Sequence, residues 1–453
     1  MMKYFILNLG CQMNQSDSER IQAVLRQMGM EKTENEEEAF VRGIVACSVR
    51  QKAIDKVYSK IYEWNEQKAS KNLLTFVSGC ILPADHEKFL KKFDLIFSLQ
   101  QLKDLPDMFR QYGVTTPFST SLEREEPEFT PLMGGFWQVK PQYSSPFEAF
   151  VPIQNGCDKF CTFCAVPYTR GREVSRPSNE VLEEVQNLVR AGYKSVTLLG
   201  QNVNSYGQDR PGQEMTFAEL LKEVGKIGQR EKADFWTYFT SPHPRDMTRE
   251  VLEVIAEYPV LAKQIHLPLQ SGDDKVLIRM NRNYGLERYR AIVKDIRSIL
   301  PTATLFTDII VGFTGETDEQ FHNTRLALEE FQFQMAFIAQ YSPRPGAASY
   351  RWEDDVPREV KKSRFHELTD VLLASSLSYN QSLVGQTLRV LVDKPDRKPG
   401  YWAARTEGKV AVRFPSQGKD LTGQFVNLRI TQVVPLSVEG ELVPEYAGQL
   451  SPL

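Results

Sequence analysis

Short apolar segments alternate with amphipathic segments along most of this chain, and this alternation is the feature that most constrains its fold. Within residues 1–117 the apolar runs are KYFILNLG, GIVA, NLLTFVSG and FDLIFSL, and runs with helical periodicity such as SDSERIQAVLRQMGM separate them. Strands that alternate with helices form parallel sheets, because each helix carries the chain back to the edge where the previous strand began. The pattern predicts an open parallel α/β sheet domain over residues 1–117.

A second alternating block covers residues 148–380 and has larger units. Six apolar runs, from FEAFVPIQ to QMAFIAQYS, are separated by amphipathic runs such as NEVLEEVQNLVRAGY. Six strand–helix repeats predict a partial (β/α)6 barrel, whose active site belongs at the carboxyl ends of the strands. Polar residues that follow the runs are expected to line a cavity there. They are Gln201, Asn202, Ser241, His243, His266, Gln270, Asp308, Gly312, Gln340 and Tyr341.

Two further stretches have a different character. Residues 118–147 are rich in Pro, Gly, Ser and Glu without a sustained period, which is typical of a linker. We interpret the segment GGFW within it as an aromatic anchor that rests on a neighbouring domain. Residues 381–446 contain short alternating runs such as KVAVRFP between Gly and Pro turns, and these predict a small all-β barrel.

The composition limits the classes of function. Lys and Arg number 55 against 58 Asp and Glu, a formal charge of -3, so a nucleic-acid surface must be local. No apolar run approaches the roughly 20 residues that cross a bilayer, and the first residues lack the pattern of a secretory signal. We therefore expect a cytoplasmic protein without membrane contact. Because disulfides are rare in that compartment, its six cysteines are expected to be metal ligands, nucleophiles or buried apolar residues.

Three cysteines in the first block directly follow the carboxyl ends of predicted strands. They are Cys11, Cys47 and Cys80. In an open parallel sheet those ends lie along one edge, where ligands bind, so the three thiols are predicted to converge on one metal site. The alternative is that each is a buried core thiol, the commoner fate of a single cysteine.

The other three cysteines, Cys157, Cys161 and Cys164, form a C-x3-C-x2-C pattern just after the first strand of the predicted barrel. Structural zinc requires four closed ligands, so the pattern fits zinc poorly. Three cysteines hold three irons of a [4Fe–4S] cluster and leave the fourth open to another ligand.

This pattern in this context resembles the radical S-adenosylmethionine (SAM) superfamily. Further blocks are similar to the MiaB branch of the methylthiotransferases, in order along nearly the whole chain. They are CQMNQSDSE, CSVRQKA, PYTRGREVSRP, LLGQNVNSYG, HLPLQSGDDKVLIRMNRNY, TDIIVGFTGET and QYSPRPG. Small departures occur: Val45 and Ala46 precede Cys47, CILPAD follows the third strand, and Thr314 replaces a usual proline. None of these removes a cysteine.

The resemblance implies an amino-terminal cluster domain, a radical-SAM barrel and a carboxyl-terminal TRAM barrel. It implies that Cys11, Cys47 and Cys80 hold an auxiliary [4Fe–4S] cluster and that Cys157, Cys161 and Cys164 hold the radical-SAM cluster. SAM would bind at the open iron. The residues expected to contact it are Phe163, Gln201, Asn202, Ser241, Gln270 and Asp308.

The implied reaction replaces the C2 hydrogen of N6-isopentenyladenosine, next to the anticodon of tRNA, by a methylthio group. The alternatives are the same chemistry on threonylcarbamoyladenosine in tRNA or on an aspartate of a ribosomal protein. A rival of another class is an RNA-binding iron–sulfur sensor without catalysis. We further expect a monomer that accepts electrons from a donor such as flavodoxin or ferredoxin.

Basic residues suggest where the tRNA anticodon stem-loop would be held. Between residues 382 and 438 nine basic residues face four acidic ones, a local excess of +5. A solvated barrel face with core aromatics is the alternative to an RNA surface. A second basic group follows the cysteine loop, where ion pairs with barrel helices are equally plausible. The candidate RNA contacts are Arg170, Arg172, Arg405, Lys409 and Arg413.

Overall fold

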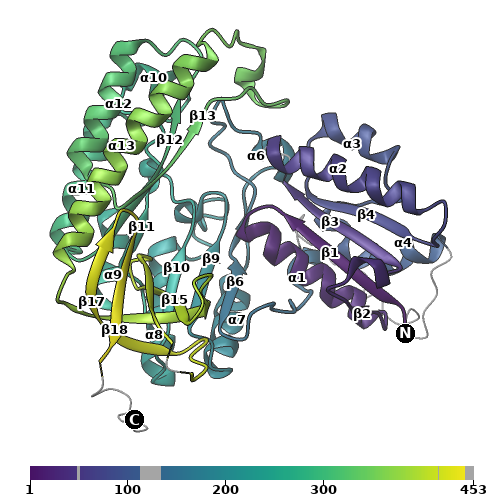
Figure 1. Cartoon of the computed structure of the whole chain (residues 1–453). Coiled ribbons are helices and arrows are strands. Elements are labelled where there is room, and N and C mark those ends of the chain that lie inside the picture. The colour runs from purple at the N-terminus through teal and green to yellow at the C-terminus, as the bar shows by residue number, and fades with distance from the viewer. Residues whose placement is uncertain (48–50, 113–133, 417, 444–453) are drawn as a thin grey trace.

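The computed structural model describes residues 1–47, 51–112, 134–416 and 418–443. Figure 1 shows an amino-terminal α/β unit beside a larger half-open barrel, with a small β-barrel below the latter. This arrangement confirms the predicted fold class.

The amino-terminal unit is built on one five-stranded sheet in the order β2-β1-β3-β4-β5, and every pair in it is parallel. The strands are β1 (Lys3–Leu9), β2 (Glu31–Lys32), β3 (Val41–Cys47), β4 (Leu74–Cys80) and β5 (Leu95–Ile96). The helices are α1 (Gln12–Gln27), α2 (Gln51–Gln67), α3 (Pro83–Leu90) and α4 (Leu105–Gln111). Separate apolar clusters cover the two faces of the sheet, as a buried parallel sheet requires.

The central unit has six parallel strands in two three-stranded sheets, β10-β9-β6 and β11-β12-β13, joined by one bridge between Thr237 and Leu261. The strands are β6 (Glu148–Pro152), β9 (Ser195–Leu199), β10 (Trp236–Phe239), β11 (Gln264–His266), β12 (Thr304–Val311) and β13 (Met335–Gln340). The helices are α6 (Val166–Arg170), α7 (Ser178–Arg190), α8 (Phe217–Glu231), α9 (Arg249–Glu257), α10 (Asp274–Arg279), α11 (Leu286–Ile299) and α12 (Asp318–Phe331). The short strands β7 (Gln154–Asn155) and β8 (Val174–Ser175) pair antiparallel beside the first strand.

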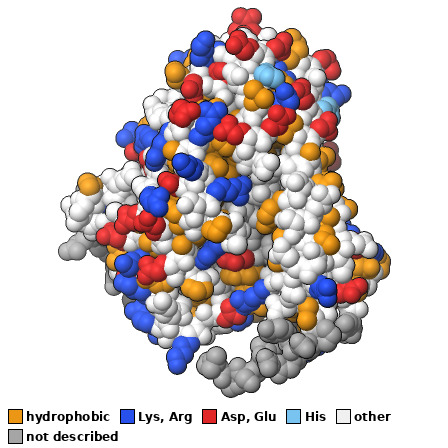
Figure 2. Space-filling model, turned by 90° about the vertical axis from the view of Figure 1, so that its left-hand side faces the viewer, with side chains coloured by type: hydrophobic (Ala, Val, Ile, Leu, Met, Phe, Trp, Pro, Cys, Tyr) orange, Lys and Arg blue, Asp and Glu red, His pale blue; other side chains and the backbone are white. Residues whose placement is uncertain are grey.

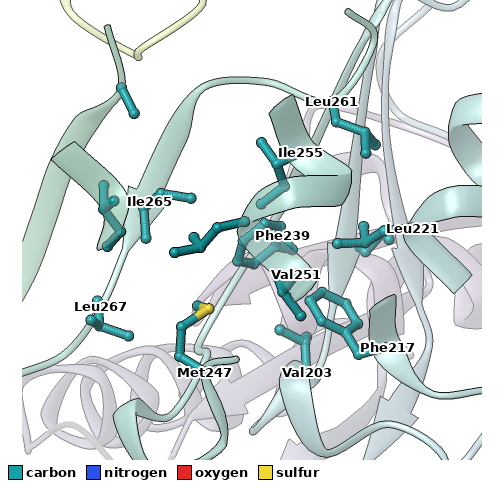
Figure 3. Packing of buried hydrophobic residues seen from close by; sticks show 14 of the residues in the cluster. Val203, Phe217, Leu221, Phe239, Met247, Val251, Ile255, Leu261, Ile265 and Leu267 are labelled. Carbon is teal, nitrogen blue, oxygen red and sulfur yellow. The ribbon is translucent and has the colours of Figure 1, made fainter. Parts of the chain in front are cut away.

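The core of this unit lies between the strands and the surrounding helices. Figure 3 shows Phe217 and Leu221 of α8 packed close to Val251 and Ile255 of α9 and Phe239 of β10. Because these faces are fully occupied, only the opposite face of each strand, toward the middle of the half-open barrel, remains for ligands.

The carboxyl-terminal unit is a closed five-stranded barrel, reached through the long helix α13 (Arg358–Ser382). Its strands are β14 (Thr387–Pro395), β15 (Tyr401–Thr406), β16 (Ala411–Pro415), β17 (Phe425–Val434) and β18 (Ser437–Leu442). The turn between β15 and β16 contacts the amino-terminal ends of the central strands. Thr304 Oγ1 donates to the Gly408 carbonyl at 2.7 Å, and the Lys263 amide donates to Glu407 Oε1 at 3.0 Å. The small barrel therefore lies at the end of the central barrel opposite to its carboxyl strand ends.

The predicted linker lies only partly within the described residues. Its residues 118–133 fall outside them, and α5 (Gly134–Trp137) follows. Phe136 and Trp137 are buried in the apolar cluster of the amino-terminal unit, so the aromatic anchor rests on that domain. Within the described ranges, no helix combines the length and apolar character needed to span a membrane.

Candidate functional site

The first cysteine trio lies at one edge of the amino-terminal sheet. Cys47 and Cys80 end β3 and β4 and are direct partners in the parallel register, and neighbouring strands lie about 4.8 Å apart. β1, which neighbours β3, ends two residues before Cys11. A hydrogen bond that the Cys80 thiol donates to Cys47, together with burial, raises the pKa of Cys80. The strand-end placement read from the sequence is therefore present in the fold.

Asn14 connects two members of this trio, although the sequence reasoning did not single it out. Its Oδ1 accepts from the Cys11 amide at 3.2 Å, and its Nδ2 donates to Cys80 Sγ at 3.7 Å and to the Ala46 carbonyl at 3.1 Å. Asn14 is fully buried in the first turn of α1. Its position three residues after Cys11, where a side chain can reach back to the helix start, was the available signal.

The second trio lies in a loop after β6, at the carboxyl end of the central barrel. Its cysteines are close enough that Cys161 influences both neighbours electrostatically. Burial, with the charge of Cys161, raises the pKa of Cys157 to about 11 and that of Cys164 to about 12. The loop is tied to the segment after α10: Asn281 Nδ2 donates to the Phe160 carbonyl at 3.0 Å, and the Thr162 amide donates to the Met280 carbonyl at 3.1 Å.

A buried arginine donates to one sulfur of each trio. Arg170 Nε lies 2.9 Å from Cys80 Sγ, and Arg282 Nη1 lies 3.2 Å from Cys161 Sγ. Both guanidinium groups are buried. Neither contact was expected, because each joins residues at least 90 positions apart. A fixed cation beside a thiol favours the thiolate, which is the form that binds metal.

The chemistry of both donor sets suits iron–sulfur clusters. Each set offers three thiols with a buried cation, and thiolates are the usual ligands of these clusters. Among the described residues, no three His, Cys, Asp or Glu side chains already stand in the geometry of a metal site. Each cysteine of a [4Fe–4S] cluster binds a different iron, and cluster binding requires loss of the thiol protons.

A buried polar network lies behind the second trio. Lys159, inside the loop, pairs with Asp246 at 2.6 Å, and Asn202 Nδ2 donates to Asp246 Oδ2 at 3.1 Å and to Ser205 Oγ at 2.7 Å. Ser205 in turn donates to Glu173, whose pKa burial raises to about 7.

Polar atoms in and beside this network remain available for a ligand. Within the described part of the chain, Asn202 Oδ1, Glu173 Oε2 and His243 Nε2 are buried without a hydrogen-bond partner. Burial lowers the pKa of His243, so its ring is neutral; Nδ1 accepts from the Arg245 amide at 3.2 Å, and Nε2 therefore carries the hydrogen and is a donor. The two oxygens suit the ammonium and ribose hydroxyl groups of SAM, and the His243 Nε2 hydrogen suits an acceptor atom of the same ligand.

The structure brings together some of the residues expected to contact SAM. Gln201 accepts from the Gly156 amide at 2.5 Å, which places it beside Cys157, and Asn202 is linked to the loop through Asp246 and Lys159. The Gln270 amide donates to the Asp308 carbonyl at 2.8 Å.

The two other expected SAM contacts are less closely linked to the loop interior. Phe163 packs edge-on against Phe313, with 6.4 Å between ring centroids. Ser241 is exposed in a left-handed backbone conformation with φ 56°. All six SAM contacts stay predictions.

The face of the barrel strands opposite the core carries accessible polar and aromatic groups. His266 Nε2 lies 2.7 Å from Asp308 Oδ2, and the His266 ring packs on Phe337 with 5.5 Å between centroids. Phe337 is 51% exposed despite lying in the middle of β13. Because the Phe337 ring is exposed inside the half-open barrel, a planar ligand can stack on it.

Three of the five candidate RNA contacts lie against partners in a neighbouring domain. Arg170 is buried against Asp17, Arg405 Nη2 pairs with Glu148 at 2.7 Å, and the Lys409 ammonium lies 4.2 Å from the centre of the Tyr238 ring. They join the domains to one another, because their long side chains meet carboxylates and rings of the neighbouring unit.

Arg172 pairs with Asp158 and Arg413 pairs with Asp396, each within its own domain, but both side chains keep larger exposed fractions and stay predicted RNA contacts. On the face shown in Figure 2, basic side chains lie intermixed with acidic ones rather than in one continuous patch.

Each of the three structural units of the chain matches a known protein family. Residues 3–98 match "Uncharacterized protein family UPF0004", residues 151–328 the radical SAM superfamily and residues 381–443 the TRAM domain. The tRNA-2-methylthio-N(6)-dimethylallyladenosine synthase of Dictyoglomus thermophilum is 37% identical over 450 residues, covering 98% of this chain and 99% of the relative. This chain belongs to that synthase family.

Other members of the synthase family agree over the same length. The protein of Neisseria meningitidis is 37% identical and covers 98% of this chain and 100% of its own. That of Burkholderia mallei is 38% identical, with 97% of each chain covered. The protein is accordingly a radical SAM enzyme, and its cofactors are SAM and [4Fe–4S] clusters.

Solved structures show the same fold at low identity. The radical SAM methyltransferase TsrM of Kitasatospora setae, with cobalamin and a [4Fe–4S] cluster bound, has a TM-score of 0.54 at 11% identity, covering 89% of this chain and 77% of its own. The cobalamin-dependent radical enzyme OxsB, with aqua-cobalamin and SAM bound, has a TM-score of 0.51 at 14% identity, covering 82% of this chain and 56% of its own. At these identities the likeness concerns the fold alone.

Proposed function

We propose that this protein is a tRNA-2-methylthio-N6-dimethylallyladenosine synthase, which adds a methylthio group to C2 of N6-isopentenyladenosine next to the anticodon. The observation that carries the proposal is the pair of cysteine trios on adjoining domains, with Arg170 contacting Cys80 from the end of the helix that follows Cys164. Full-length relatives with this name support it.

The clusters and SAM, when bound, supply sulfur and a radical able to remove a hydrogen from an unactivated carbon. The chain supplies the ligands: Cys11, Cys47 and Cys80 for the auxiliary cluster, and Cys157, Cys161 and Cys164 for the radical-SAM cluster. Burial of Cys47, Cys80 and Cys161 limits the access of water to these sulfurs, whereas Cys11 is exposed. The residues that would hold SAM are Phe163, Gln201, Asn202, Ser241, Gln270 and Asp308.

The target adenosine must leave the stack of the anticodon loop to reach the barrel. Enzymes that modify bases commonly extrude them and hold them against aromatic side chains. The ring of Phe337 and the His266–Asp308 pair are suited to this role, since they are accessible on the free face of the strands.

The proposed function also requires contacts with the tRNA outside the barrel and an electron donor. Exposed basic residues of the small barrel support contacts with the tRNA backbone, alongside Arg172 and Arg413. These exposed residues are Lys394, Arg397, Lys398, Lys419 and Arg429. We further propose that the protein is a cytoplasmic monomer and that it receives electrons from a donor such as flavodoxin or ferredoxin. Its proposed domains are residues 1–117, 148–380 and 381–446, with a linker at 118–147.

A single assay tests the proposal. Reconstituted protein is incubated anaerobically with SAM, a reductant and tRNA that carries isopentenyladenosine, and the nucleosides are analysed by mass spectrometry. We expect 2-methylthio-isopentenyladenosine from this tRNA and no product from the same tRNA without the isopentenyl group.

Two parallel substrates identify the alternatives. A methylthiolated product on threonylcarbamoyl-tRNA or on a ribosomal protein, with none on isopentenyl-tRNA, would show that the protein acts on one of these alternative substrates. Absence of 5′-deoxyadenosine under all conditions would instead favour an iron–sulfur sensor.

A further inference from the structure

Arg170 is the last residue of the short helix α6, and this helix begins two residues after Cys164. At about 1.5 Å per residue, its five residues advance the chain by roughly 8 Å. The Cys157 amide donates to the Gly171 carbonyl at 3.2 Å, so the chain returns to its starting point immediately after Arg170. The loop that carries the second trio therefore presents one arginine to the amino-terminal domain.

Every nitrogen of the Arg170 guanidinium has a partner, and the contacts with Cys80 and Asp17 cross this domain boundary. Nε donates to Cys80 Sγ at 2.9 Å, Nη1 donates to Asn155 Oδ1 at 3.1 Å, and Nη2 pairs with Asp17. Asp17 is fully buried on α1, and Arg170 is 8% exposed. A planar guanidinium can make these contacts together, whereas an ammonium group on a lysine stem cannot reproduce the fork.

We propose that Arg170 is a positioning residue for the auxiliary cluster: it fixes Cys80 relative to the second trio and sets the charge that this sulfur experiences. The inference rests on the proposed cysteine ligands and goes beyond them, because it assigns control of one cluster to a residue on the loop of the other.

Loss of the Arg170 charge and loss of the Asp17 charge shift the reduction potential of the auxiliary cluster in opposite directions. Reduction adds an electron to a cluster, so a neighbouring positive charge and an N–H donor on sulfur favour the reduced state. Removing the Arg170 charge lowers the reduction potential of the auxiliary cluster. Removing the Asp17 charge leaves the arginine uncompensated and raises that potential.

The test is an EPR-monitored redox titration of the reconstituted full-length protein, with the SAM-responsive signal assigned to the second trio. We expect a negative shift of the other signal in Arg170→Met, a positive shift in Asp17→Asn, and a potential near wild type in Arg170→Lys. All three variants should unfold at lower temperature than wild type, because each breaks a buried network.

A matched control separates charge tuning from loss of structure. Arg176 is a buried arginine of the same segment that pairs with Glu184 and Glu180 rather than with a cysteine. Arg176→Met should lower the unfolding temperature without moving either potential.

If the reduction potential shifts with the same sign in Arg170→Met and Asp17→Asn, or shifts in neither variant, the pair has only a structural role. This result would overturn the proposal. If Arg170→Met does not fold, Asp17→Asn decides by the sign of its shift. Because the potentials are measured without tRNA, a wild-type protein that lacks methylthiolation activity contradicts the proposed function and not this inference.

Discussion

Arg282 donates from Nη1 to Sγ of Cys161 across 3.2 Å, although 121 positions separate the two residues. A second guanidinium nitrogen donates to the Pro268 carbonyl at 3.1 Å, and Nε donates to the Tyr284 hydroxyl at 3.2 Å. The segment that follows β11 thus carries the donor for the cysteine loop that follows β6. The Arg282 guanidinium therefore reaches Cys161 only when the barrel has folded; the cysteine loop alone does not position it.

Replacing Arg282 should weaken the second cluster and spare the first. Without the guanidinium, the Cys161 sulfur loses its donor and the Pro268 carbonyl loses a partner, at about 1–3 kcal/mol for each buried group left unpaired. We expect Arg282→Met to lose iron selectively from the second trio and to lower the potential of what remains. Iron analysis and EPR measure both effects, and an equal loss from the two clusters would contradict the local role.

Iron content tests the assignment of the second trio. Two four-iron clusters give about eight irons per chain. Replacing Cys157, Cys161 and Cys164 together with alanine should halve the iron and abolish formation of 5′-deoxyadenosine. Full retention of iron in this variant would show that these thiols do not hold a cluster.

The first trio should be dispensable for SAM cleavage but required for sulfur insertion. The barrel has its own strands and core, so replacing Cys11, Cys47 and Cys80 with alanine should leave it folded. We expect continued 5′-deoxyadenosine formation without methylthiolated tRNA, both measured in one reaction. Methylthiolation at the wild-type yield would refute the role of these cysteines.

Gly156 should tolerate no side chain. Its φ is 82°, and a Cβ there would lie 2.0 Å from the Arg172 carbonyl oxygen, next to the bond from the Cys157 amide to the Gly171 carbonyl that joins the two ends of the cysteine loop. Gly156→Ala should therefore distort the loop and lower iron binding at the second trio, as measured by iron analysis. Gly171→Ala is the matched control: its φ of 78° and ψ of -161° lie in a region that is essentially restricted to glycine, but no described atom lies within 4 Å of the added Cβ, so only a backbone cost of about 1–3 kcal/mol is expected.

Lys409 should affect stability rather than tRNA binding. Burial, together with the nearby Arg405 charge, lowers its pKa to about 8 from 10.5. Below pH 8 the folded state keeps a buried charge. Between pH 8 and 10.5 the folded state loses this proton before the unfolded state does, so stability rises with pH in that window. The difference corresponds to about 3 kcal/mol.

Lys409→Met should therefore raise the unfolding temperature at pH 7 and have little effect near pH 10.5, with unchanged tRNA affinity. The exposed Lys398, replaced by methionine in the same way, is the comparison and should weaken tRNA binding. A tenfold loss of tRNA affinity in Lys409→Met would show that this residue contacts the RNA and would contradict the prediction.

The sequence alone determined the parts of this protein that depend on local pattern. Apolar runs predicted strands such as β3 and β12, because burial of a parallel strand on both faces requires continuous apolar residues. The position of Cys47 and Cys80 at strand ends followed directly, since the carboxyl ends of parallel strands share one edge. The resemblance then supplied the family, which neither spacing nor composition identifies.

The tertiary structure decided how the domains meet. The polar side of α1, including Ser16, Asp17 and Arg20, is buried against the barrel, although its composition is typical of a solvated face. Arg170 and Lys409 resemble surface cations in the sequence, yet one is buried beside Cys80 and the other lies over Tyr238. Whether a charged side chain meets solvent or an opposite charge depends on residues far away in the chain, and only folding brings those residues together.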